Sequence, residues 1–164
     1  MKTFIKQKLS EALNLPSLRL PKNIDITDDE LNHIKHITWK ELKIDDLGGN
    51  GNIAHLAINF PFETEANNGI VVDIQVLNGK IYQIHIHMVK ELQGLGLGYK
   101  IYKALIADLG HLYSGKGRRL NPFITKIWDK LKQDNEIECV SNEHGDLCMT
   151  KNNPNKNELI KFIS

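Results

Sequence analysis

The fold is decided by Tyr82-Gln-Ile-His-Ile-His-Met88 and, shortly after it, by Leu92-Gln-Gly-Leu-Gly-Leu-Gly98. The first stretch alternates apolar and polar residues, which predicts a strand over 80–89 with His85 and His87 on its polar face. The second stretch carries alternating glycines, and residues 99–109 then repeat apolar side chains at helical spacing. A strand, a glycine loop and a helix in this order present several backbone N–H groups to an anion at the start of the helix.

Strands are also expected upstream of this stretch. Asn78-Gly79 lies between the strand and another alternating run, 70–77, and predicts a hairpin because both residues tolerate the positive φ of a type I′ turn. Further upstream, 39–47 and 53–60 have strand patterns and are separated by the turn sequence Gly48-Gly-Asn-Gly51.

The C-terminal half continues with short elements. The expected elements are a strand over 111–114, a helix after Asn121-Pro122, strands over 136–141 and 146–150, and a helical piece over 158–163. The sequence therefore predicts an α/β (α+β) domain over 39–164, with a central, twisted, mostly antiparallel mixed sheet and helices on both faces.

Residues 1–38 are predicted to form an N-terminal helical extension. An amphipathic pattern over 2–14 ends before Pro16 and Pro21, and a capping-box spacing at Thr27-Asp-Asp-Glu30 predicts a second short helix. The first of these helices is a candidate arm for a protein partner, although it is equally able to fold back on its own domain.

Composition excludes several classes of protein. At 164 residues with a net charge of +1, the chain fits one soluble domain and lacks the positive field of a nucleic-acid binder. No apolar run approaches the roughly 20 residues of a membrane span, and no signal peptide is evident. Cys139 and Cys148 are expected to be reduced thiols in neighbouring strands. We therefore expect a reducing compartment and a cytoplasmic protein. Abundant Lys and Asn are typical of AT-rich genomes and indicate a bacterium or a phage-infected host cell as the source.

The glycine loop is the motif that carries chemistry. Its spacing, Gln93-x-x-Gly96-x-Gly98, resembles the pyrophosphate-binding motif of the GCN5-related N-acetyltransferase (GNAT) superfamily, Gln/Arg-x-x-Gly-x-Gly/Ala. A dinucleotide-binding fingerprint fits less well, because its glycine spacing differs and Asp108 comes too early for its acidic residue. A nucleoside triphosphate loop is excluded, since no Gly-Lys-Ser/Thr follows the glycines.

A second stretch matches the same family. The family pattern Asn-x-x-Ala-x-x-x-Tyr-x-Lys-Leu is similar to Asn121-Pro-Phe-Ile-Thr-Lys-Ile-Trp128-Asp-Lys130-Leu131, with the same spacing from Asn to Lys-Leu. The resemblance covers about residues 39–150. It implies a GNAT-like fold and the transfer of an acetyl group from acetyl-CoA to an amine, with no metal required.

The resemblance also implies which residues bind the cofactor. The pyrophosphate would be held by N–H groups of the glycine loop, and the pantetheine arm would pair with the backbone ahead of it. Asn121 would bond the pantetheine or acetyl region, and it is also a good helix N-cap. The predicted cofactor-binding residues are Met88, Val89, Lys90, Gln93, Gly94, Leu95, Gly96, Leu97, Gly98 and Asn121.

The catalytic groups are less well defined. The tyrosine that serves the family as general acid is replaced by Trp128, whose indole N–H does not supply a proton at neutral pH. His85 and His87 are candidate bases because imidazole titrates near neutral pH. Tyr113 is a candidate acid, with Tyr82 and Tyr102 as alternatives. The same residues have explanations without catalysis: the two histidines can lie on the polar face of a strand, and the tyrosines can belong to the core. A non-catalytic binding or assembly module, for example in a phage particle, therefore remains the alternative to an enzyme.

Overall fold

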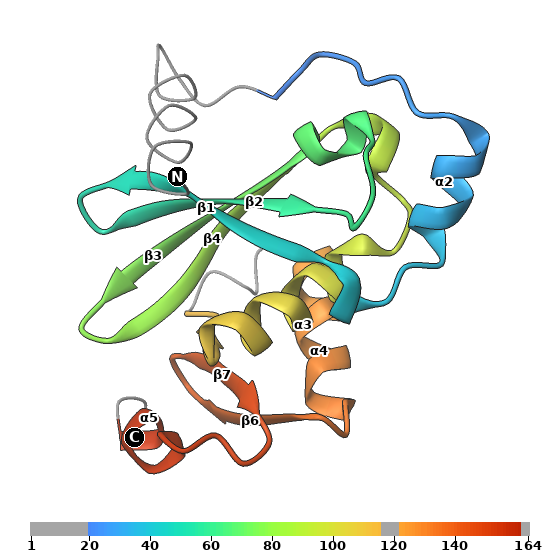
Figure 1. Cartoon of the computed structure of the whole chain (residues 1–164). Coiled ribbons are helices and arrows are strands. Elements are labelled where there is room, and N and C mark those ends of the chain that lie inside the picture. The colour runs from blue at the N-terminus through green and yellow to red at the C-terminus, as the bar shows by residue number, and fades with distance from the viewer. Residues whose placement is uncertain (1–19, 116–121, 162–164) are drawn as a thin grey trace. The chain divides into compact units, whose positions relative to one another are not determined.

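A computed structural model describes residues 20–115 and 122–161, so the predicted helix over 2–14 and Asn121 lie outside the described residues (Figure 1). The chain divides into two compact units. The first unit comprises 1–75 and 84–97, and the second comprises 76–83 and 98–164. The proposed domain boundary after residue 38 stays a prediction.

Among the described residues, the first helix of the first unit is α2 (Asp28–Lys35), which starts at the predicted capping box. The backbone N–H of Glu30 donates to the Thr27 hydroxyl at 3.2 Å, and the Thr27 N–H donates to the Glu30 carboxylate at 2.7 Å. These two bonds satisfy N–H groups that a helix start leaves open. The prediction of a helix here is confirmed, and Ile34 anchors it in the core.

The strands of the first unit follow one another in order as β1 (Lys43–Asn50), β2 (Ile53–Asn59), β3 (Ile70–Leu77) and β4 (Lys80–Met88). β3 and β4 also contribute residues to the second unit. The predicted hairpin is confirmed, because Asn78 and Gly79 both have positive φ, +51° and +79°. β2 pairs antiparallel with β1 and with β3.

The prediction of a strand over 39–47 was wrong at its start. Trp39–Glu41 forms a short 3-10 helix, because the Glu41 carboxylate accepts the Thr38 N–H at 2.7 Å and holds the chain in a turn. The expected turn at Gly48–Gly51 is also shorter than predicted, since β1 runs on to Asn50. Gly49 permits this continuation: a Cβ there would lie 2.0 Å from the Ile53 carbonyl oxygen.

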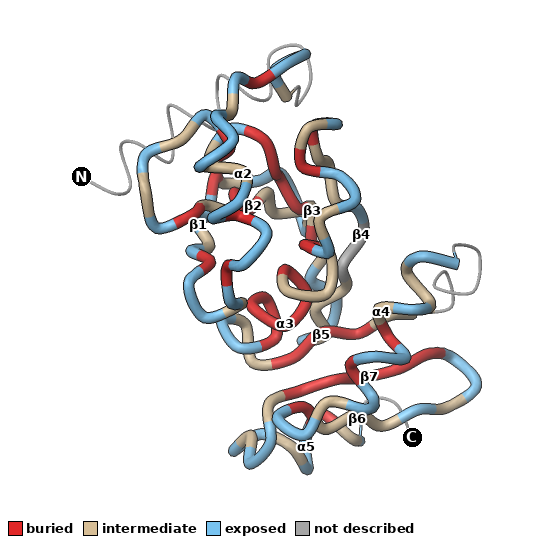
Figure 2. The backbone as a smooth tube through the Cα atoms, turned by 90° about the vertical axis from the view of Figure 1, so that its right-hand side faces the viewer, coloured by how far each residue is buried: buried red, intermediate tan, exposed pale blue. Residues whose placement is uncertain are grey.

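The second unit has the strand order β4, β5 (His111–Tyr113), β7 (Gly145–Thr150) and β6 (Ile137–Asn142). β5 pairs in parallel with the start of β4 and antiparallel with β7, and β6 also runs antiparallel to β7. The expected mixed, mostly antiparallel sheet is therefore confirmed. β7 is buried along nearly its whole length (Figure 2).

Three further helices complete the described chain. Helix α3 (Leu97–Leu109) follows the glycine loop, α4 (Pro122–Gln133) carries proline in its first turn as predicted, and α5 (Lys156–Lys161) lies near the C-terminus. In the second unit α4 packs on β6 and β7. Its buried side chains there, Trp128 and Leu131, lie one helical turn apart.

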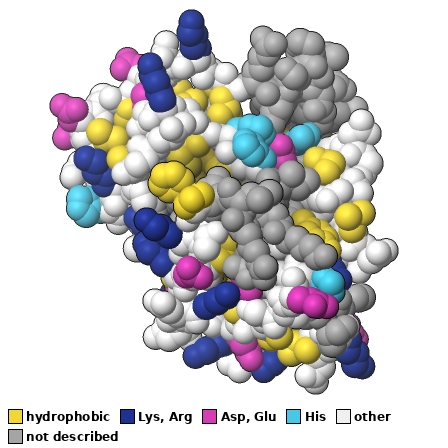
Figure 3. Space-filling view, turned by 180° about the vertical axis from the view of Figure 1, so that it is seen from behind, with side chains coloured by type: hydrophobic (Ala, Val, Ile, Leu, Met, Phe, Trp, Pro, Cys, Tyr) yellow, Lys and Arg dark blue, Asp and Glu magenta, His cyan; other side chains and the backbone are white. Residues whose placement is uncertain are grey.

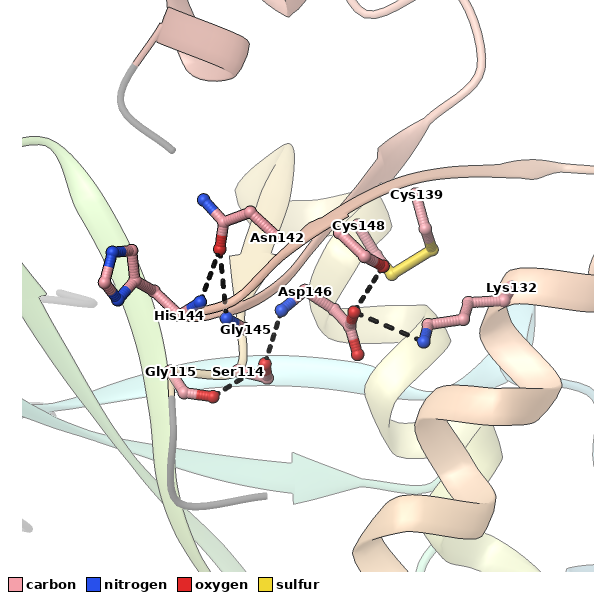
Figure 4. A network of polar contacts seen from close by, with 10 residues as sticks. Ser114, Gly115, Lys132, Cys139, Asn142, His144, Gly145, Asp146 and Cys148 are labelled. Atoms are coloured by element: carbon pink, nitrogen blue, oxygen red, sulfur yellow. Dashed lines mark hydrogen bonds and ion pairs between the residues drawn. A yellow bond between two sulfur atoms is a disulfide. The ribbon is translucent and has the colours of Figure 1, made fainter. Parts of the chain in front are cut away.

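A buried polar network in the second unit centres on Asp146 (Figure 4). The side chain of Asp146 has no exposed surface, and its Oδ1 lies 3.2 Å from Lys132 Nζ and accepts the Ser141 hydroxyl. The Asp146 N–H donates to the Ser114 hydroxyl at 2.8 Å, and the Ser114 N–H donates back to the Asp146 carbonyl. The network holds the end of β5 on β7, and the ion pair offsets the cost of burying the carboxylate.

The two cysteines correct a sequence prediction. They lie in neighbouring strands as expected, but Cys139 and Cys148 form a disulfide and are not free thiols. The antiparallel register of β6 and β7 sets them directly opposite each other, with their Cα atoms 4.1 Å apart. The inference of a reducing compartment therefore loses its basis.

We expect the double variant Cys139→Ser/Cys148→Ser to lower the free energy of unfolding by about 2–3 kcal/mol, because the crosslink restricts the unfolded chain over a loop of roughly ten residues. Guanidinium denaturation of the variant and of the oxidised protein measures the difference. Wild-type protein kept reduced should match the variant. Equal denaturation midpoints for oxidised and reduced protein would contradict the expected stabilisation.

We expect His111 to lower the stability of the protein in acid. Its side chain is buried, and the Ile81 N–H donates to its Nε2 at 3.2 Å. Burial lowers the pKa of His111, so below about pH 6.5 the unfolded chain binds a proton more readily than the folded chain. Acidification from pH 7.5 to 5.5 should therefore reduce the free energy of unfolding by up to about 1.4 kcal/mol from this group. His111→Gln should weaken that dependence in urea titrations at both pH values, and an unchanged dependence would exclude His111 as its source.

Candidate functional site

The chain between β4 and the glycine loop is fixed in the first unit. The Val89 N–H donates to the Gly69 carbonyl at 2.9 Å, and a short 3-10 helix over Lys90–Leu92 follows. Leu92 is fully buried and Val89 nearly so. Gly69 allows this close contact, since a Cβ there would come within 2.9 Å of both side chains. The loop therefore starts from a rigid base.

Gln93 fastens the loop to the end of the strand. Its Nε2 donates to the Met88 carbonyl at 2.9 Å. The Val89 and Lys90 carbonyls also accept hydrogen bonds within the turn, from Leu92 and Gln93 respectively. Backbone carbonyls keep a second lone pair, so these groups still have acceptor capacity. The predicted pairing of a pantetheine arm with Met88, Val89 and Lys90 stays a prediction.

The two central glycines of the loop have left-handed backbone conformations. Gly94 has φ +78° and Gly96 has φ +73°, and a Cβ at either position would meet no atom within 4 Å. The backbone is thus free to be approached closely on this side. Among the described residues, the N–H groups of Gly94, Leu95 and Gly96 donate to no backbone carbonyl. Their arrangement suits an anion.

Helix α3 begins directly after this turn, at Leu97. The N–H groups of a first helical turn have no partner within the helix, and they form the positive end of its dipole. The Leu97 side chain is buried, whereas Gln93, Gly94 and Gly96 are exposed. Gly98 lies in the second unit against Ile127, where a Cβ would come within 2.9 Å of that side chain. The loop therefore exposes its backbone to solvent at the start of α3.

A cluster of histidines on β2 and β4 of the first unit surrounds an aspartate on β3. Asp73 accepts hydrogen bonds from two rings: its Oδ1 lies 2.6 Å from His55 Nδ1, and its Oδ2 lies 2.8 Å from His87 Nε2. The rings of His85 and His87 have centroids 4.4 Å apart. Figure 3 shows histidine side chains gathered beside an acidic side chain on the face drawn there. The geometry brings together both predicted bases.

Sequence reasoning missed Asp73 and His55. They are directly opposite each other in the antiparallel register of β2 and β3. Their pairing depends on the register of the two strands. The connection between the strands contains the 3-10 helix Glu65–Asn68, and its sequence does not predict that register. Alternation along β2 and β3 was the available signal, since it sets His55 and Asp73 each on the polar face of its strand.

The aromatic candidates are core residues of the second unit. Tyr113 is 4% exposed and packs edge-to-face on Tyr82 with ring centroids 5.0 Å apart, and burial raises its pKa. Trp128 is 1% exposed and packs edge-to-face on Tyr102 at 5.6 Å. Trp128 thus fills core space where the family has its acid, and Tyr113 as an acid stays a prediction.

The described residues offer neither a metal centre nor a membrane span. Within 20–115 and 122–161, no three His, Cys, Asp or Glu side chains are arranged to hold a metal ion. Among the helices of these same ranges, none is long and apolar enough to cross a bilayer.

Comparison with protein-family models and with curated proteins gives no match. Among solved structures, the chain is similar to the ribosomal-protein-S18-alanine N-acetyltransferase from Escherichia coli, with 13% identity over 77% of this chain and 89% of that chain and a TM-score of 0.39. It is also similar to a protein from Bacteroides thetaiotaomicron assigned to the GNAT family of acetyltransferases. In that case the identity is 11% over 94% of this chain and 85% of that chain, and the TM-score is 0.44. At these identities neither likeness bears on activity.

Proposed function

We propose that this chain binds acetyl-CoA and transfers its acetyl group to an amine. The observation that carries the proposal is the exposed turn at Gly94 and Gly96, whose left-handed backbone leads into the N-terminus of α3. Backbone N–H groups at such a position hold a pyrophosphate without cationic side chains. The family motif Gln93-x-x-Gly96-x-Gly98 falls on the same turn.

His87 is the base in this proposal. It directly precedes Met88, which is the first of the residues whose backbone is expected to pair with the pantetheine arm. Its Nε2 faces Asp73, so its Nδ1 is left to take a proton from the attacking amine. The neutral amine then attacks the thioester carbonyl, the C–S bond of the tetrahedral intermediate breaks, and the thiolate of CoA takes up the second proton that the amine nitrogen loses. The acceptor is an amine of unassigned kind.

A second candidate is a non-catalytic binding module with the same fold, including one that serves in a phage particle. The burial of Trp128 against Tyr102 favours it, because this position provides no acid for the leaving thiolate. A fold alone does not decide between an enzyme and a binding module.

Release of free CoA thiol distinguishes the two candidates. The protein is incubated with acetyl-CoA and, in separate reactions, a polyamine, an aminoglycoside and a peptide with a free N-terminus. An enzyme releases thiol in an amine-dependent way, and His87→Gln should reduce that rate by roughly 100-fold with acetyl-CoA binding unchanged. Acetyl-CoA binding without amine-dependent release from any acceptor would instead support the binding module.

A further inference from the structure

We infer that Asp73 is a positioning residue for His87 and that His55 fixes Asp73 in turn. This inference rests on the proposed function, in which His87 takes the proton of the amine. One carboxylate holds two imidazoles through separate oxygens, at 2.6 Å for His55 and 2.8 Å for His87. All three residues belong to the first unit, on the three strands β2, β3 and β4.

The hydrogen bonds determine where each ring carries its proton. An ionised carboxylate only accepts hydrogen bonds, so the ring nitrogen that faces it must be the N–H. His55 is therefore protonated on Nδ1 and His87 on Nε2 in their neutral forms. The lone pair of His87 is then on Nδ1, which points away from the bond to Asp73. A histidine fixed in this way is oriented for proton transfer from one nitrogen only.

Exposure distinguishes the two rings. The His87 side chain is 35% exposed and that of His55 is 15% exposed. A substrate amine therefore reaches His87 more readily. His55 is the less accessible partner, and its bond to Oδ1 prevents the carboxylate from rotating away from His87. When His87 accepts a proton on Nδ1, the imidazolium gains a charge-assisted bond to Asp73 and later returns the proton to water.

Ring tautomers test the inference without any acceptor. Long-range ¹H–¹⁵N spectra of the full chain at pH 8 should show His55 with its proton on Nδ1 and His87 with its proton on Nε2. Asp73→Asn keeps the shape of the side chain but offers one oxygen and one NH₂, so at least one ring must change its tautomer. Asp45→Asn is the matched control, because Asp45 lies on β1 of the same unit and accepts from Asn59.

Two results would overturn the inference. The first is His55 protonated on Nε2 in the wild-type protein, and the second is an Asp73→Asn protein whose two rings are both unchanged. A kinetic measurement adds to this: with any accepted amine, Asp73→Asn should reduce kcat by about tenfold or more while acetyl-CoA affinity stays the same. Unchanged kcat would limit Asp73 to a structural role, which also overturns the inference. A complete lack of turnover in the wild type, with the expected tautomers, would refute the proposed function instead.

Discussion

Gly96→Glu should weaken acetyl-CoA binding by about 100-fold or more, a loss of roughly 2.7 kcal/mol, with the fold intact. The substitution sets a carboxylate next to the N–H groups that the proposal assigns to the pyrophosphate, where it competes with the ligand and repels it. A Cβ at this position would meet no atom within 4 Å, so the first carbon of the new side chain causes no clash. The φ of +73° adds a backbone strain of about 1–2 kcal/mol.

Gly51→Glu is the matched control for this variant. Gly51 lies in the turn between β1 and β2, has φ +62° and also has no atom within 4 Å of a Cβ. It therefore introduces the same charge and a similar strain away from the loop. Binding should be normal in Gly51→Glu, and equal affinity in both variants would remove the argument from the glycine loop.

Lys103→Met should destabilise the protein by about 3–5 kcal/mol. In the second unit, Lys103 Nζ lies 2.8 Å from Asp134 Oδ2 and 2.9 Å from Glu136 Oε1, and Lys103 is 6% exposed. Tyr99 also donates its hydroxyl proton to Asp134, and burial together with this bond raises the pKa of Tyr99 to about 12. Removing the ammonium leaves the buried Asp134 carboxylate without its cation.

The pKa of Asp134 gives the same interaction a pH dependence. Burial opposes ionisation, but the hydrogen bonds from Lys103 and Tyr99 outweigh it and lower the pKa of Asp134. A lowered pKa means that the stabilisation is present above about pH 4 and is lost as the pH falls further. Lys103→Met should therefore reduce the loss of stability on acidification below pH 4.

Denaturant titrations at pH 7 measure the effect of Lys103→Met. Lys126→Met removes an exposed lysine from α4 and should change stability by less than about 0.5 kcal/mol. The double variant Lys103→Met/Asp134→Leu should recover much of the loss, because it removes both buried charges. A Lys103→Met protein as stable as Lys126→Met would show that the buried pair contributes nothing.

Local chemistry made much of the fold predictable. The hairpin at Asn78-Gly79 and the helix start at Thr27 each depend on a few adjacent residues, and both were predicted from the sequence. Two predictions were wrong because they depended on interactions that the alternation of apolar and polar residues does not show. The Glu41 carboxylate accepts a hydrogen bond from the Thr38 N–H, and this bond stabilises a 3-10 helix where a strand was expected. The disulfide depended on the register of two strands.

In the candidate site too, the part formed by adjacent residues was predictable, and the part formed by different strands was not. The loop from Gln93 to Gly98 is contiguous, so its spacing in the sequence was enough to single it out. The partners of His87 come from other strands, and only the folded sheet brings Asp73 and His55 to it. Trp128 stands where the family pattern has tyrosine, and its burial against Tyr102 shows that it serves in core packing.

Calorimetric titration of the purified protein with acetyl-CoA tests the central claim most directly, with CoA and an adenine nucleotide as comparison ligands. We predict saturable binding in the micromolar range by the wild type and by Gly51→Glu, and binding weaker by about 100-fold or more by Gly96→Glu. No binding by a well-folded wild-type protein would contradict the assignment of the glycine loop to acetyl-CoA.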